Sequence, residues 1–204
     1  MIYCVDFDGT LLNSSHRHFV VMCDVLKALG KEILFTEEEY LQYKFSGNST
    51  KQFCLKRMGL NEPESEKIAK LWGKWIEEEK YLKYDVLYDD VRAFLNGCKV
   101  QDIQLVLLTA RKNEELAKKQ VKSMGIDGYF AYVYVVNPSN AMEGKKEIIE
   151  QLLNDEEEVV VIGDTEVEYG IVEELKLRGV ILNRGFRNKQ YWDSKNVESF
   201  EGLP

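Results

Sequence analysis

The sequence predicts an α/β protein: a Rossmann-like core whose parallel β-sheet carries helices on both faces, plus an inserted all-α cap domain. From about position 89 onward, short apolar segments alternate with stretches of helical periodicity, which is typical of parallel strands joined by right-handed crossovers. Between position 13 and about position 82 only helical patterns occur. We therefore expect the core to comprise 1–12 and 85–204, and the cap domain to comprise 13–84.

The first predicted strand is followed directly by two acids. Ile2–Val5 is a short apolar run, and the turn signal at Gly9 ends the segment. Asp6 and Asp8 lie two apart, so in an extended chain their carboxylates would project to the same side and converge. Like charges that close repel unless a cation or a shared proton separates them. Because ligands of open α/β sheets bind past the carboxyl ends of strands, this pair marks a candidate site, the alternative being an Asp-Gly turn with solvated acids.

The insert reads as a series of helices. Apolar side chains recur at helical spacing from 19 to 29, and a second helix begins after Thr36, where three glutamates occupy the first turn. Segment 46–50 reads as a loop with good N-cap residues, followed by helix to Gly59. The stripe from Ile68 to Ile76 predicts a further amphipathic helix.

The remaining elements alternate between strand and helix. Strands are expected at 103–108, 132–136, 159–162 and 180–182, with helices around 91–95, 116–124 and 145–153 and between the last two strands. Alternation of this kind indicates a parallel sheet.

Composition limits the function. There are 27 Lys plus Arg against 35 Asp plus Glu, a formal charge of −8, which argues against nucleic acid or an anionic membrane as partner. Cys4, Cys23, Cys54 and Cys98 are widely spaced within apolar or helical patterns and are expected to be buried reduced thiols. No apolar run has the length of a membrane span, and the early acidic pair leaves no room for a presequence. We expect a cytoplasmic monomer or homodimer.

Polar residues at further strand ends complete a possible reaction centre. Thr109 ends one strand, Asp164 follows another, and Lys145 opens a helix. Together with the acidic pair, this combination suits phosphoryl transfer: one carboxylate attacks phosphorus and the other moves the proton of the leaving oxygen. A hard cation, most plausibly Mg²⁺ bound by Asp6 and Asp164, would balance the negative charge. Lys145, Thr109 and backbone N–H groups would hold the phosphoryl oxygens.

Four stretches carry a family resemblance. They are D-F-D-G-T-L-L-N-S at 6–14, L-L-T-A-R at 107–111, G-K-K-E-I-I at 144–149 and V-V-V-I-G-D-T-E-V-E at 159–168. In this order the chain resembles the haloacid dehalogenase-like hydrolase superfamily, in the Mg²⁺-dependent phosphatase branch that includes phosphoglycolate phosphatases and β-phosphoglucomutases.

The resemblance implies a role for each matching residue. Asp6 would be the nucleophile that forms an aspartyl phosphate, and Asp8 the acid/base residue, whose carbonyl also binds the metal. Thr109 would bind phosphate, Asp164 would be a metal ligand, and Lys145 is preferred to Lys146 as the stabilising ammonium because the family's lysine leads a K-x-E-I-L-like helix start. Glu168, where the family often has a second Asp, would orient the lysine or a metal-bound water. The acid at Asp8 disfavours dehalogenation.

Substrate contacts are expected from two regions. Gly9, Thr10 and Ala110 would bind phosphate beside Thr109, and Arg111 would reach a phosphate or a substrate carboxylate, with a surface ion pair as the alternative. The helical insert resembles the family's first-type cap, a lid that excludes water. Within it, S-G-N-S-T-K at 46–51 is similar to a substrate-contacting loop, which gives the cap candidates Asn48, Ser49 and Lys51; a simple helix N-cap would equally explain the segment.

The expected activity is that of a phosphatase acting on a small phosphorylated metabolite. A phosphomutase of the β-phosphoglucomutase type is the alternative within the family, because it shares the fold, the cap type and these residues. A non-catalytic receiver-like phospho-switch is a more remote possibility, because receivers place their acids on different strands and have no helical insert.

Overall fold

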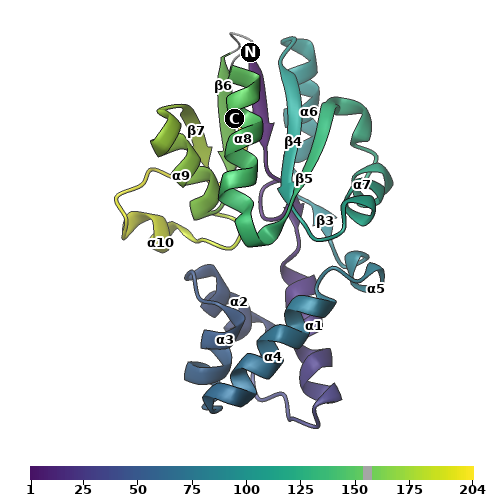
Figure 1. The fold of residues 1–204 in the computed structure, drawn as a ribbon, viewed down its shortest axis with the longest axis vertical. Coiled ribbons are helices and arrows are strands. Elements are labelled where there is room, and N and C mark those ends of the chain that lie inside the picture. Colours follow the sequence, from purple (N-terminus) through teal and green to yellow (C-terminus); the bar gives the residue numbers. More distant parts are fainter. Residues whose placement is uncertain (154–157) are drawn as a thin grey trace.

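A parallel sheet forms the centre of the protein. The computed structural model describes residues 1–153 and 158–204. Five strands of the described chain pair in the order β5-β4-β1-β6-β7, and every pairing is parallel (Figure 1). The strands are β1 (Ile2–Val5), β4 (Gln104–Ala110), β5 (Phe130–Val136), β6 (Val159–Gly163) and β7 (Arg178–Ile181). The predicted parallel α/β core is confirmed.

Helices cover both faces of this sheet. The strands alternate their buried side chains between two hydrophobic clusters, as the two-residue period of a strand requires. In one cluster, Val5, Leu107 and Ile162 pack with α6 (Val91–Val100) and α7 (Glu114–Ser123). In the other, Cys4, Val106 and Val161 pack with α8 (Ala141–Leu153) and α9 (Glu166–Leu175). The sheet is therefore a middle layer whose exposed surface is confined to its ends and edges.

The helical insert has a core of its own and lies beyond one end of the sheet (Figure 1). Its elements are α1 (Ser15–Ala28), α2 (Glu37–Phe45), α3 (Thr50–Gln52), the π-helical turn η1 (Phe53–Arg57), α4 (Glu62–Trp75) and α5 (Glu79–Leu82). Thr36 begins α2 with a capping box: its hydroxyl accepts from the Glu39 N–H, and the Glu39 carboxylate accepts from the Thr36 N–H. The separate core supports the prediction that this unit acts as a cap.

A small antiparallel ribbon joins the insert to the sheet. Its strands, β2 (Leu12–Asn13) and β3 (Val86–Leu87), are two residues long, and the sequence analysis had not anticipated them. The ribbon places the entry and the exit of the insert side by side, just past β1.

The cap also contacts the core at a second place. Ser46 and Arg187 form an antiparallel bridge, and the Asn188 N–H donates to the Phe45 carbonyl over 2.8 Å. Gly47 has a φ of +82°, and a Cβ there would overlap the Tyr191 ring, so this approach requires glycine. The structure therefore has the cap seated against the core.

The chain after β7 forms a further helix and packs against the core. It contains α10 (Lys189–Asp193), whose Trp192 is fully buried against Ile181 and Val197. Two short 3₁₀ turns, η2 (Asp127–Tyr129) and η3 (Pro138–Asn140), flank β5. Through Asn188 and Tyr191, the C-terminal segment supports the cap contact.

The sequence led to two further expectations, one about the state of the cysteines and one about membrane-spanning segments. All four cysteines are buried free thiols, as predicted. No helix in the part of the chain that the structure describes has the length and apolar character needed to cross a membrane.

Candidate active site

Three predicted site residues meet at the carboxyl ends of adjacent central strands. Asp6 follows β1, Thr109 lies near the end of β4, and Asp164 follows β6. All three are buried, with exposed fractions of 7%, 1% and 0%. The Asp6 N–H donates to the Ile162 carbonyl over 2.9 Å, which extends the β1–β6 pairing up to the acid. The parallel register therefore brings together groups that lie more than one hundred residues apart in sequence.

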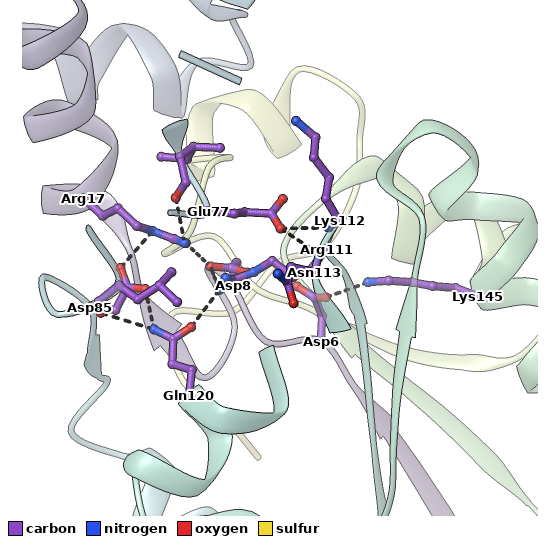
Figure 2. Close-up of polar contacts among 12 residues, drawn as sticks. Asp6, Asp8, Arg17, Glu77, Asp85, Arg111, Lys112, Asn113, Gln120 and Lys145 are labelled. Carbon is purple, nitrogen blue, oxygen red and sulfur yellow. Dashed lines mark hydrogen bonds and ion pairs between the residues drawn. The ribbon is translucent and has the colours of Figure 1, made fainter. Parts of the chain in front are cut away.

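Lys145, which lies on α8, connects this cluster to Glu168 on α9. Its ammonium donates to Asp6 Oδ1 over 2.6 Å (Figure 2) and to Glu168 Oε1 over 2.5 Å. The other Glu168 oxygen, Oε2, accepts from the Thr165 hydroxyl over 2.6 Å, so Glu168 orients the lysine. Lys146 instead pairs with Glu174. Of the two neighbouring lysines, it is Lys145 that faces the nucleophile candidate.

Asp164 is held by the loop after β1 and by the segment after β7. Its Oδ1 accepts from the Thr10 hydroxyl over 3.3 Å, and its Oδ2 accepts from the Phe186 N–H over 2.8 Å. Gly9 has a φ of +82°, and a Cβ there would overlap the Asp164 carboxylate. Gly9 is therefore needed for both its backbone conformation and its lack of a side chain, and it lets the β1 loop approach Asp164 closely.

The charges of this cluster do not balance without a further cation. Asp6, Asp164 and Glu168 are three buried carboxylates, and Lys145 is the buried ammonium among them. Burial raises the pKa of Asp6 to about 7, although the nearby Lys145 acts in the opposite direction. Burial and the charge of Asp6 raise the pKa of Asp164 well above its usual range. Buried carboxylates this close disfavour ionisation unless positive charge is added.

This donor set fits a magnesium ion. Within residues 1–153 and 158–204, no group of three His, Cys, Asp or Glu side chains is placed to hold a metal ion. Mg²⁺ typically binds one or two carboxylates and keeps several waters, so Asp6, Asp164 and a backbone carbonyl would suffice. Glu168 is already engaged by Lys145 and Thr165, which favours the indirect role expected for it.

Asp6 and Asp8 have different partners: Lys145 donates to Asp6, whereas Arg17 and Arg111 donate to Asp8, although the charge of Asp8 still raises the pKa of Asp6. Residues after β1 are not extended: the N–H groups of Leu11 and Leu12 both donate to the Phe7 carbonyl, over 3.0 and 2.8 Å. The i, i+2 rule for strands therefore does not apply beyond Val5.

The Asp8 carboxylate instead lies between two guanidiniums (Figure 2). Arg111 donates through Nε to Oδ2 over 2.5 Å and through NH2 to Oδ1 over 2.8 Å, and Arg17 donates to Oδ1 over 2.5 Å. Burial alone would raise the pKa of Asp8, but Arg111 and Arg17 together hold it well below its usual range. The Asp8 side chain is therefore a partly buried, ionised partner of two arginines.

Arg17 was missed by the sequence analysis. It lies on α1, is 2% exposed, and also pairs with Asp85 Oδ1 over 3.1 Å. A single arginine between two histidines, in a helix with no recognised motif, gives no signal of its role. Its partners come from distant segments and become apparent only in the fold.

The cap candidates behave differently. The Asn48 amide donates to the Tyr43 carbonyl over 3.1 Å, Ser49 is the N-cap of α3, and Lys51 pairs with Glu62. These contacts all lie within the cap, so the structure does not bring the three residues to the acidic cluster, and their role in substrate binding stays a prediction. Lys44, which was not predicted, is a further cation of the cap: it lies over the Trp72 ring, and burial together with Arg187 lowers its pKa to about 8.

Comparison with solved structures places this fold among known ones. A haloacid dehalogenase-like family hydrolase from Streptococcus pneumoniae is similar at a TM-score of 0.72 and 18% identity, over 97% of this chain and 91% of that chain. A predicted phosphatase from Clostridium acetobutylicum is similar at a TM-score of 0.69 and 15% identity, over 97% of this chain and 92% of that chain. A predicted phosphoglycolate phosphatase from Haemophilus somnus is similar at a TM-score of 0.66 and 19% identity, over 92% of this chain and 87% of that chain.

At these identities the likeness establishes the fold, including its helical cap. None of the curated proteins compared with the chain matches it. The family model of haloacid dehalogenase-like hydrolases matches residues 3–171. Because this match covers well over half of the sequence, the chain belongs to the haloacid dehalogenase-like hydrolase family.

Proposed function

We propose that the protein is a Mg²⁺-dependent phosphatase that hydrolyses a small phosphorylated metabolite through a phosphoryl group carried on Asp6. The observation that carries the proposal is the Asp6 carboxylate itself: it lies at the end of a central strand, next to the Asp164 carboxylate and 2.6 Å from the Lys145 ammonium. A carboxylate in such surroundings is placed to attack phosphorus, with an ammonium beside it to attract the phosphoryl oxygens.

The other residues have distinct roles in this proposal. Asp6 would displace the leaving oxygen and form an acyl phosphate, which water then hydrolyses to inorganic phosphate. Asp8, which is ionised between Arg17 and Arg111 in this structure, would have to leave them and take up a proton from solvent; it would then give this proton to the leaving oxygen in the first step and take one from water in the second. The Thr109 hydroxyl and nearby backbone N–H groups, with those of Gly9, Thr10 and Ala110 as candidates, would bind the phosphoryl oxygens. A magnesium ion on Asp6 and Asp164 would neutralise charge on the phosphoryl group.

The cap suits this chemistry. Phe45 and Ser46 of the cap contact Asn188 and Arg187 of the core, so the cap is seated against the core. Closure of this kind excludes bulk water from the acyl phosphate, and opening about the β2–β3 ribbon would release the product. The four buried free thiols suit a reducing compartment, and we propose a cytoplasmic location.

The test is hydrolysis of a panel of phosphomonoesters with Mg²⁺ by the wild-type protein, Asp6→Asn and Asp127→Asn. Asp127 is exposed and lies in η2, away from the cluster, so its amide variant is a matched control. We expect the Asp6 variant to lose turnover and the control to keep it. Mg²⁺-dependent turnover by Asp6→Asn would exclude Asp6 as the nucleophile. Isomerisation of sugar phosphates without release of free phosphate would instead identify a phosphomutase.

A further inference from the structure

A closed ring of five side chains lies next to the catalytic cluster (Figure 2). It runs from Asp8 to Arg17, Asp85, Gln120 and Arg111, and back to Asp8. Arg17 donates to Asp8 and lies 3.1 Å from Asp85; Gln120 donates to Asp85 over 2.7 Å; and Arg111 donates to Gln120 over 3.2 Å and to Asp8. The ring spans the cap and the core, since Arg17 belongs to α1 and Gln120 to α7.

The two guanidiniums keep their orientation without Asp8. Arg17 also donates to the Ile76 carbonyl over 3.3 Å, and Asp85 faces it on the side away from Asp8. Arg111 is held from behind by Gln120, which donates to the Leu82 carbonyl over 3.3 Å. Arg17 and Arg111 are 2% and 5% exposed, so water cannot replace an anionic partner well. If Asp8 turned away, a preformed pair of buried cations would remain, with one place for an anion.

That place is close to the reaction centre. The charge of Asp8 raises the pKa of Asp6, so the two carboxylates lie near each other, and an anion held where the Asp8 carboxylate now lies would be near a phosphoryl group on Asp6. The guanidinium fork matches carboxylate and phosphate oxygens in a bidentate fashion. Exchange of Asp8 for an external carboxylate also leaves the charge of the ring unchanged, because the ring holds two cations, Arg17 and Arg111, and two anions, Asp8 and Asp85.

We propose that Arg17 and Arg111 form a subsite for a second anionic group of the substrate, and that Asp8 occupies this subsite in the free protein. The substrate would then be a phosphomonoester whose leaving part carries a carboxylate or a second phosphate a few bonds from the ester oxygen. Binding of that group displaces Asp8 from the two guanidiniums. This inference rests on the proposed phosphatase function and specifies its substrate class.

The subsite is tested by binding, which needs no turnover. Isothermal titration in Mg²⁺ buffer compares ethylphosphonate with 3-phosphonopropionate and 1,2-ethylenediphosphonate, which add a carboxylate or a second phosphonate to the same two-carbon unit. Because hydrogen bonds to charged groups contribute about 1.5–3 kcal/mol, we expect at least one doubly anionic probe to bind roughly tenfold or more tightly than ethylphosphonate. The probe that binds more tightly than ethylphosphonate identifies the second anionic group of the substrate as a carboxylate or a phosphate. Tighter binding of both probes supports a subsite that accepts either group.

Three variants separate the subsite from a structural ion pair. The preference is the ratio of the affinity for the doubly anionic probe to the affinity for ethylphosphonate. In Arg111→Lys and Arg17→Gln this ratio should fall toward unity. Arg57→Gln, which removes a surface arginine paired with Glu39 on the cap, should keep the wild-type preference. In Asp8→Asn the preference should rise above that of the wild type, because the competing carboxylate is gone. A gain of affinity cannot arise from misfolding.

The outcomes separate this inference from the proposed function. Equal binding of all three probes by the wild type, with no gain in Asp8→Asn, would overturn the subsite even if the protein hydrolyses phosphomonoesters. A tenfold preference that disappears in the arginine variants would support the subsite even if no phosphomonoester is hydrolysed. In that case the phosphatase proposal, and not the subsite, would be wrong.

Discussion

Replacing Lys145 with methionine should reduce both stability and activity, because this lysine is the buried ammonium among three buried carboxylates. It lies 2.6 Å from Asp6 and 2.5 Å from Glu168, and only 4% of its side chain is exposed. Methionine keeps the length of the side chain and removes its charge, so Asp6 and Glu168 lose their shared partner. Removal of one partner from a buried ion pair typically costs about 3–5 kcal/mol of unfolding free energy.

The adjacent lysine offers a matched control. Lys146 lies on the same helix, and its partners Glu143 and Glu174 are at the surface. Surface ion pairs contribute about 0–1 kcal/mol, so Lys146→Met should change the unfolding free energy by no more than this. Loss of a group that stabilises transferring charge typically lowers kcat by about 10²–10³-fold, and we expect this loss in Lys145→Met but not in Lys146→Met.

The stability cost should also depend on pH. In the wild type, Lys145 lowers the pKa values of Asp6 and Glu168; without it, burial raises both above those of the unfolded chain. A carboxyl group with a raised folded-state pKa binds more protons when folded, so the stability of Lys145→Met should fall as pH rises from about 4 to 7. Urea unfolding of both variants at pH 5 and pH 7, with phosphate release measured at pH 7, checks this. Equal stability and equal activity of the two variants would refute the assignment of Lys145.

Three further predictions concern the acid/base residue, the metal ion and the cap. Asp8→Asn should slow substrates with poor leaving groups most, because an activated leaving group such as 4-nitrophenolate needs no proton; an equal loss across an alkyl and aryl phosphate series would contradict the acid role. Exhaustive chelation should abolish turnover, added Mg²⁺ should restore it, and Mg²⁺ should raise the melting temperature of the wild type, since it would bind the folded acidic cluster. A chelated protein that keeps its activity would remove the metal ion from the scheme. Lys44→Met should be stabilised relative to the wild type near neutral pH. Burial lowers the folded-state pKa of Lys44 to about 8, so the free energy of unfolding of the wild type increases as pH rises from about 8 to 10.5. Urea unfolding should therefore show that the gap in unfolding free energy between the wild type and Lys44→Met narrows over that range. A gap that is constant with pH would contradict this placement of Lys44.

The sheet and the acidic cluster were predictable because their signals are local. Each central strand is a short apolar run, and each run ends in a polar residue: Asp6, Thr109 and Asp164. Once the strands are parallel, their carboxyl ends share one edge, so the residues meet without any knowledge of side-chain contacts. The helical insert was equally clear, because its apolar positions follow helical spacing and its caps are short-range motifs.

The rest of the site depends on contacts that no local pattern encodes. The strands of the β2–β3 ribbon, Leu12–Asn13 and Val86–Leu87, are too short to show an alternation of apolar and polar residues. The turn that redirects Asp8 depends on hydrogen bonds to the Phe7 carbonyl, so the strand rule failed one residue after β1 ended. Arg17 acquires its role only when α1 approaches the sheet. Ser49 is the N-cap of α3, as one of the two interpretations of its segment expected, and its role in substrate binding stays a prediction.

The most direct test of the account is the identity of the residue that carries the phosphoryl group. Reaction mixtures quenched during turnover and treated with borohydride convert an aspartyl phosphate to homoserine, which peptide mass spectrometry locates. We predict homoserine at position 6 in the wild-type protein, dependent on both substrate and Mg²⁺, and none in Asp6→Asn. Turnover that leaves Asp6 unmodified while another residue is reduced would contradict the account.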